Sequence, residues 1–208
     1  MKKSSQLPLI GISKTKLCGR KNPLVIKSVM VIWITGLSGA GKSTIANGIA
    51  DRLRGIGIKP LMIDGDILRE ELCKDLGFST ADRSENIRRA AAIAQIASLS
   101  GIVSVCSLIS PQRSERESIR AACKSRKIPF LEVYLSTPLE TCEERDPKGL
   151  YKKARSGLIP CFTGIDSPYE APISPEVEIP SQQLSIEESI TLVWKNIEPF
   201  LQNTERFS

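Results

Sequence analysis

Residues 31–44 read VIWITGLSGAGKST, an apolar run that leads into a glycine-rich turn and then into a segment compatible with a helix. This stretch matches the phosphate-binding pattern G-x-x-x-x-G-K-[ST] at every fixed position. Glycine suits such a turn because it has no Cβ, so the backbone N–H groups can approach phosphate oxygens. The buried-strand pattern before the turn and the amphipathic pattern after it are the context that the motif requires, which argues against a chance glycine turn.

The turn predicts a site for ATP and Mg²⁺. Lys42 is expected to contact the β- and γ-phosphates, and Ser43 is expected to hold Mg²⁺ through its hydroxyl. The positive end of the following helix adds to the attraction for the anion. The predicted ATP-binding residues are Gly36, Leu37, Ser38, Gly39, Ala40, Gly41, Lys42, Ser43 and Thr44.

The overall composition is that of a soluble single-domain protein. The chain has 208 residues, of which 41% are hydrophobic and 25% charged, and no apolar run approaches the roughly 20 residues that cross a membrane. The net charge of +6 lies in the first 29 residues, which hold seven basic residues and no acidic one. We interpret residues 1–28 as a flexible basic tail and residues 29–208 as one domain, with neither nucleic acid nor a membrane as partner. The alternative for the tail is an arm that contacts RNA, a membrane or a partner protein.

Six cysteines are spread along the chain without a C-x-x-C pair, and histidine is absent. This spacing gives neither a structural zinc site nor a disulfide framework, and it favours a reducing compartment, so we expect a cytoplasmic protein. Without histidine, a general base has to be a carboxylate or a less common group.

Apolar runs that alternate with helical segments predict an α/β fold, in which helices cover both faces of a mostly parallel sheet. Strands are expected at residues 29–35, 59–63, 102–109, 130–135 and 177–179. Helices are expected at residues 42–54, 67–74, 83–99, 114–126, 138–145 and 186–201. The helix at 114–126 is predicted to be exposed. The helix at 83–99 is predicted to bury a face made of Ile87, Ala91, Ala94 and Ile96.

Ligands of such sheets bind at the carboxyl ends of the strands, so residues 36–43, 64–66 and 110–111 are predicted to line one crevice. Asp64 and Asp66 follow the second strand and are candidates for holding Mg²⁺ and for accepting the proton of an acceptor hydroxyl. The alternative for Asp66 is a structural role as the cap of the next helix. We assign catalysis to Asp64 and Lys42, and metal binding to Ser43 and Asp64.

Residues 146–172 are dense in glycine, proline and positive charge. A long basic loop of this kind in a phosphate enzyme is typical of a mobile lid. The alternative is a plain surface loop. We therefore expect this segment to close over the crevice.

Several stretches are longer than a nucleotide-binding motif. They are residues 36–44, DGD at 64–66 with Arg69, KDLGFS at 74–79, DRSENIRR at 82–89, ISP at 109–111, RDPKGLY at 145–151 and FTGIDSPYE at 162–170. Together, over about residues 31–179, they resemble the adenylylsulfate kinase (APS kinase) family. The resemblance implies a P-loop kinase fold and transfer of the ATP γ-phosphate to the 3′-hydroxyl of adenosine 5′-phosphosulfate, which gives PAPS and ADP in sulfate assimilation.

The resemblance also implies an acceptor site. Phe78 and Phe162 are expected to sandwich the acceptor adenine, and Asp64 matches the family's essential acidic residue near the 3′-hydroxyl. Small-molecule nucleotides are the expected partners, and the family suggests a homodimer. The implied acceptor-binding residues are Asp66, Arg69, Phe78, Arg83, Asn86, Ile109, Ser110, Lys148 and Phe162.

The sequence departs from the family beside the acceptor arginine. Ile67 stands where Asn is usual, and Leu108 stands where Phe is usual. Glu70 and Glu71 replace His-Gly or Gln-Gly. A kinase of the same fold that acts on another nucleotide-linked acceptor, such as a cytidine diphosphate derivative, is therefore the main alternative. A nucleotide-dependent switch or binding module is a second alternative, which the lack of an N-K-x-D guanine motif disfavours.

Overall fold

The computed structural model describes residues 29–201, so the tail predicted at residues 1–28 lies outside the described residues, as do residues 202–208. Within the described range, the strands form one sheet in which all neighbours run parallel. The spatial order is β2-β3-β1-β4-β5. The strands are β1 (Val31–Thr35), β2 (Leu61–Asp64), β3 (Ser104–Ser107), β4 (Phe130–Leu135) and β5 (Val177–Ile179).

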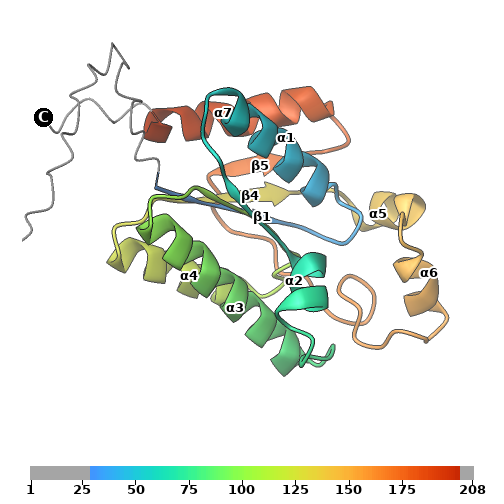
Figure 1. Cartoon of the computed structure of the whole chain (residues 1–208). Coiled ribbons are helices and arrows are strands. Elements are labelled where there is room, and N and C mark those ends of the chain that lie inside the picture. Colours follow the sequence, from blue (N-terminus) through green and yellow to red (C-terminus); the bar gives the residue numbers. More distant parts are fainter. Residues whose placement is uncertain (1–28, 202–208) are drawn as a thin grey trace, which may run out of the picture.

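Helices cover both faces of this sheet, as the alternating sequence pattern predicts. Figure 1 shows α1 and α7 on one face and α3 and α4 on the other. The helices α5 and α6 lie beyond the carboxyl ends of the strands, on the side of β4 (Figure 1). The helices are α1 (Lys42–Gly55), α2 (Gly65–Glu71), α3 (Thr80–Leu99), α4 (Arg113–Ser125), α5 (Leu139–Arg145), α6 (Leu150–Arg155) and α7 (Ile186–Leu201).

The central strand β1 is buried along its whole length. Successive side chains of a strand point to opposite faces. Ile32 and Ile34 therefore pack into the core between the sheet and the α1–α7 layer, while Val31 and Trp33 pack into the core under α3 and α4. This two-sided burial explains why β1 reads as a continuous apolar run rather than an alternating one.

The predicted α/β class, the parallel sheet and all five strands are confirmed, with boundaries shifted by a few residues. Two burial predictions are wrong. Ile96 is 65% exposed, because it lies only two residues after the buried Ala94, a step that turns it away from the core face. The helix predicted as exposed at 114–126 buries Arg116, Ile119 and Cys123. Within residues 29–201, no helix combines the length and the hydrophobicity needed to cross a membrane.

Truncating Leu53, which is fully buried in α1, should lower the free energy of unfolding. The Leu53→Ala substitution removes apolar contacts and leaves a cavity, at a cost of about 2–5 kcal/mol. The matched control is Leu99→Ala in α3, since Leu99 is 61% exposed and its truncation should cost less than about 0.5 kcal/mol. Urea unfolding of both variants checks this, and equal losses would contradict the described core.

Candidate active site

The glycine-rich turn between β1 and α1 has the backbone shape that its sequence predicts. Gly36, Gly39 and Gly41 all have positive φ angles, of 147°, 74° and 101°. A Cβ at Gly36 would lie 2.9 Å from the carbonyl oxygen of Leu135, and one at Gly39 would lie 3.0 Å from that of Cys142. A side chain at either position would therefore displace neighbouring backbone. All nine predicted ATP-binding residues lie in this turn or in the first turn of α1.

The ammonium of Lys42 folds back over the turn, where Nζ donates a hydrogen bond to the carbonyl of Leu37 at 2.7 Å. Burial lowers the pKa of Lys42 to about 8, against the opposing effect of the nearby acidic groups, which include Asp66 and Asp64. A buried ammonium has lost most of the hydration that would stabilise its charge in water. The ammonium of Lys42 would therefore strongly attract an anionic ligand.

The carboxylate of Asp64 is the most highly connected acidic group in the crevice. Its Oδ2 accepts hydrogen bonds from Ser43 Oγ at 2.9 Å and from Ser107 Oγ at 2.7 Å. Its Oδ1 accepts from the backbone N–H of Asp66 at 2.9 Å. Burial works against ionisation, but the bonds from Ser107, Asp66 and Ser43 together hold the pKa of Asp64 below its usual range. Asp64 is therefore ionised at neutral pH, as a metal ligand or a general base has to be.

Asp64 also forms the N-cap of α2. The alternative interpretation in which Asp66 caps this helix is therefore wrong. Asp66 instead pairs with Lys148, which lies 82 residues further along the chain. This ion pair connects α2 with the predicted lid.

The residues expected to hold Mg²⁺ lie together. The hydroxyl of Ser43 and the carboxylate of Asp64 are hydrogen-bonded to each other, and both are hard oxygen ligands of the kind Mg²⁺ prefers. Among residues 29–201 there is no cluster of three or more His, Cys, Asp or Glu side chains suited to a metal. That is compatible with Mg²⁺, which proteins usually hold through one or two side chains, with phosphates and water completing its shell.

Two arginines and an aromatic ring form the opposite side of the crevice. The guanidinium of Arg69 lies 4.8 Å from the ring centre of Phe78 and donates to the carbonyl of Gly77. Arg83 donates to the carbonyl of Phe78 at 3.0 Å and to Thr163 Oγ1 at 3.1 Å. Burial, followed by the charge of Arg83, lowers the pKa of Arg69.

Neither arginine forms an ion pair with a carboxylate in the described part of the chain. Two like charges that lack a carboxylate within salt-bridge distance favour an anionic ligand. Phe78 is 65% exposed, so one face of its ring is available for stacking against a flat group.

Two of the remaining predicted acceptor-site residues, Asn86 and Ser110, are buried. Asn86 is buried in α3, and its Oδ1 has no hydrogen-bond partner. Ser110 is almost fully buried and has a positive φ of 38°. Its hydroxyl accepts from Trp33 Nε1 and donates to Thr35 Oγ1, which in turn donates to the carbonyl of Ile109. Ser110 and Ile109 are thus fixed to the end of β1.

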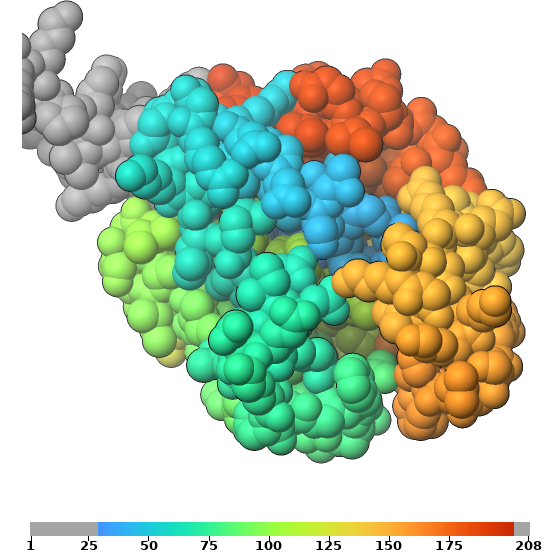
Figure 2. Space-filling model, turned by 45° about the vertical axis from the view of Figure 1, so that its right-hand side comes forward, coloured from blue at the N-terminus to red at the C-terminus, as the bar shows by residue number. Residues whose placement is uncertain are grey.

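The predicted lid contacts both sides of the crevice. Tyr151 in α6 donates to the carbonyl of Ser38 at 2.9 Å, which joins the lid to the glycine-rich turn. Phe162 is 7% exposed and its ring packs edge-on against Tyr151, at 5.0 Å between ring centres. Figure 2 shows a hollow between the α2–α3 region and residues 146–172, with the turn above it. The lid also contains a helix, α6, that sequence analysis did not predict.

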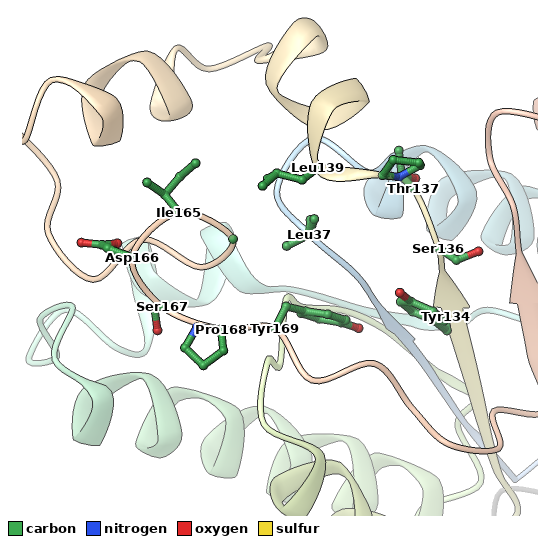
Figure 3. A pocket seen from close by; sticks show the side chains of 12 residues that line it. Leu37, Tyr134, Ser136, Thr137, Leu139, Ile165, Asp166, Ser167, Pro168 and Tyr169 are labelled. Atoms are coloured by element: carbon green, nitrogen blue, oxygen red, sulfur yellow. The ribbon is translucent and has the colours of Figure 1, made fainter.

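A cavity of about 660 Å³ opens next to the glycine-rich turn, on the side of β4. In Figure 3, Leu37 of the turn lies between Leu139 of α5 and the lid segment that carries Ile165 and Tyr169. Of its lining residues, Leu37 was predicted to bind a ligand, and residues 164–169 lie in the FTGIDSPYE stretch that resembles the family. The others come from stretches without a motif. Neither Ser107 nor Tyr151 was predicted as a site residue. Tyr151 lies in the RDPKGLY stretch and Ser107 lies near the end of the strand predicted at 102–109, so both positions were usable signals.

Of the residues that depart from the family pattern, Leu108 is buried, with 3% exposure, and the other three lie at the surface. Ile67 is 60% exposed, and Glu70 and Glu71 are also exposed. Glu71 lies 3.9 Å from Lys74, an exposed ion pair of the weak kind. Neither glutamate forms a salt bridge with Arg69, whose guanidinium faces Phe78 instead.

Comparison with known proteins agrees with this geometry. The model of a family described as adenylylsulphate kinase matches residues 28–180. The adenylyl-sulfate kinase of Vibrio parahaemolyticus is 50% identical over 162 residues, which is 78% of each chain. That of Citrobacter koseri is 53% identical over 154 residues, 74% of this chain and 76% of the relative. A solved structure of the Mycobacterium tuberculosis APS kinase CysC in complex with AMPPNP and APS is 44% identical, with a TM-score of 0.77, and covers 81% of this chain and 97% of that one.

Replacing Lys42 with methionine should make the folded protein more stable and the enzyme less active. Because the folded protein lowers the pKa of Lys42 from its ordinary value to about 8, the unfolded chain binds an extra proton between those pH values. Lys42→Met should therefore raise the free energy of unfolding at pH 7 by roughly 1–3 kcal/mol. The wild type should recover this difference as the pH rises from about 8 to 10.5.

The same variant should lose phosphoryl transfer by about 10²- to 10³-fold. Lys59→Met is the matched control, since Lys59 is exposed and should change stability by less than about 0.5 kcal/mol. Denaturant unfolding at pH 7 and pH 10 measures the effect. A Lys42→Met protein that is less stable than the wild type at pH 7 would contradict the buried, desolvated ammonium.

Proposed function

The chain belongs to the adenylylsulphate kinase family, and we propose that it transfers the γ-phosphate of ATP to the 3′-hydroxyl of adenosine 5′-phosphosulfate, giving PAPS and ADP in sulfate assimilation. One observation carries this proposal. Asp64 is hydrogen-bonded to Ser43 of the ATP-binding turn, and its neighbour Asp66 is paired with the lid lysine. These contacts support an interpretation in which an ionised carboxylate lies between the proposed triphosphate site and the proposed acceptor site.

On the ATP side, the glycine-rich turn offers backbone N–H groups and Lys42 offers a desolvated positive charge. Ser43 and Asp64 are the residues that would hold Mg²⁺, which neutralises charge on the phosphates when bound. The buried hydroxyl of Tyr151 is bonded to Ser38, so we propose that the lid excludes water from the transferred phosphoryl group.

On the acceptor side, Phe78 offers a stacking face for adenine, and Arg69 and Arg83 offer charge for the phosphosulfate. The unpaired Oδ1 of Asn86 is a buried acceptor that a ligand donor would satisfy. Phe162 is nearly buried against Tyr151, so stacking on both faces of the adenine would need the lid to present more of that ring.

Asp64 is proposed as the group that accepts the proton of the 3′-hydroxyl. Its lowered pKa keeps it ionised at neutral pH, and its bonds to Ser43 and Ser107 fix its orientation. Phosphoryl transfer needs mainly alignment and charge neutralisation, so a weak but well-placed base suffices. The chain contains no histidine that could take this role instead.

A same-fold kinase for another nucleotide-linked acceptor is the second candidate, and the departures at Ile67, Glu70 and Glu71 favour it. Their exposure weakens it, and among the described residues neither glutamate forms a salt bridge with Arg69. We further propose that the protein acts as a homodimer in the cytoplasm. Its described cysteines are all free thiols, which suits a reducing compartment. A solved relative from Thiobacillus denitrificans, 28% identical with a TM-score of 0.60, is described as hexameric and is covered over 30% of its chain.

An acceptor panel tests the proposed substrate. The protein is incubated with ATP and Mg²⁺ plus adenylylsulfate, AMP or a cytidine diphosphate derivative, and ADP release is followed. We expect release with adenylylsulfate to exceed release with the other acceptors by at least about tenfold, because the two arginines require the phosphosulfate charge. ADP release with a cytidine nucleotide but none with adenylylsulfate would overturn the assignment.

Replacing Asp64 with asparagine tests the proposed base. Asp64→Asn keeps the size of the side chain but removes the charge, so kcat should fall by about 10²- to 10⁴-fold. Asp51→Asn is the matched control, because Asp51 is an exposed residue of α1 whose one salt bridge within residues 29–201 is with Arg54. Steady-state kinetics of both variants measures the effect, and an Asp64→Asn enzyme with unchanged kcat would rule out the catalytic role.

A further inference from the structure

One arginine lies at the buried junction of three segments that form the crevice. Arg116 of α4 is 1% exposed. Its Nε donates to Glu132 Oε1 at 2.8 Å, its Nη1 to the carbonyl of Ser110 at 2.5 Å and its Nη2 to the carbonyl of Glu170 at 2.5 Å. A planar guanidinium can serve three acceptors in different directions in this way.

Burying such an ion pair is weak evidence for a role in stability, because desolvation offsets most of the attraction between the charges. The two backbone carbonyls are the informative partners. Ser110 belongs to the acceptor loop, defined here as residues 109–112, and its φ of 38° is unusual for a residue with a side chain. Glu170 belongs to the lid root, defined here as residues 169–171. Arg116 therefore holds a strained loop and the end of the lid at the same time.

The acceptor loop and the lid root are also bonded to each other. The N–H of Glu170 donates to the carbonyl of Pro111 at 2.9 Å, and the carboxylate of Glu170 accepts from the N–H of Arg113 at 2.8 Å. The hydroxyl of Tyr169 is hydrogen-bonded to Thr35 Oγ1 at 2.9 Å. Thr35 therefore bonds to both segments from the end of β1. Arg116 bonds to a backbone carbonyl of each segment from α4, and its guanidinium lies 5.6 Å from the ring centre of Tyr169.

We propose that Arg116 is a positioning residue, which sets the acceptor-binding geometry by fixing the acceptor loop and the lid root to each other. This inference rests on the proposed function for the identity of the acceptor. The connection that Arg116 makes between the acceptor loop and the lid root does not depend on which acceptor binds. The glycines of the ATP-binding turn pack against Leu135 and Cys142, and neither is among the hydrogen-bond partners of Arg116 in the described residues. The effect of Arg116 should therefore fall on the acceptor and not on ATP.

The chain offers a matched control one turn along the same helix. Arg120 pairs with Glu132 Oε2 at 2.9 Å and with Glu176, but in the described residues it forms no hydrogen bond with Ser110 or Glu170. Arg116→Lys and Arg120→Lys therefore both keep a positive charge facing Glu132. Only Arg116→Lys loses the planar guanidinium that donates to the carbonyls of both Ser110 and Glu170. A lysine ammonium is a compact point charge without this geometry.

The test compares both lysine variants with the wild type by steady-state kinetics. Arg116→Lys should raise the KM for the acceptor by roughly tenfold, the effect of one to two lost hydrogen bonds, while the KM for ATP changes by less than about twofold. Arg120→Lys should leave both KM values within about twofold of the wild type. If adenylylsulfate proves inactive with the wild type, the proposed function fails, and the KM values are measured with whichever acceptor releases ADP.

Hydrogen exchange measured without substrate provides a second, independent readout. Amides of residues 163–171 should exchange faster in Arg116→Lys than in Arg120→Lys or the wild type. Glu170→Ala provides a second variant that leaves the core intact, because Glu170 is exposed, and it should raise the acceptor KM in the same direction. Equal changes in both KM values for Arg116→Lys, or unchanged exchange in the lid root, would overturn the proposal.

Discussion

The crevice depends on the way β1 ends between β3 and β4. At that point Gly36 passes so close to the carbonyl of Leu135 that no side chain fits, and the buried hydroxyl of Thr35 bonds to the loop that follows β3. The end of the central strand therefore holds the triphosphate-binding turn and the acceptor loop next to each other. Asp64 reaches the same point because β2 runs parallel to β3 and ends beside Ser107.

The sequence was sufficient for those features whose geometry is local or periodic. The glycine-rich turn needs positive φ angles at fixed positions, and buried parallel strands need continuous apolar runs, so both leave a pattern in the chain. Asp64 was predictable because it ends a strand next to the turn in an open parallel sheet. The helix predicted at residues 83–99 is also confirmed, although it begins at Thr80, where Ser79 caps it by accepting from the N–H of Asp82.

Features that rest on contacts between distant segments were not predictable. Arg116 reads as one charge among many on a polar helix, and only the packing of α4 on β4 shows that it is buried against Glu132. Ile96 was predicted to be buried because isoleucine is apolar, but its position along the helix turns its side chain towards solvent. The contact between Tyr151 and Ser38 joins residues 113 positions apart, and no local pattern records it.

The central claim is that the crevice directs the γ-phosphate of ATP to one hydroxyl of an adenine nucleotide. The most direct measurement is ³¹P nuclear magnetic resonance of the product formed from ATP, Mg²⁺ and adenylylsulfate by the wild-type protein. We expect a new phosphate monoester on the 3′-hydroxyl, in equal amount to the ADP formed. Free inorganic phosphate without a new ester, or a phosphate at another position, would contradict it.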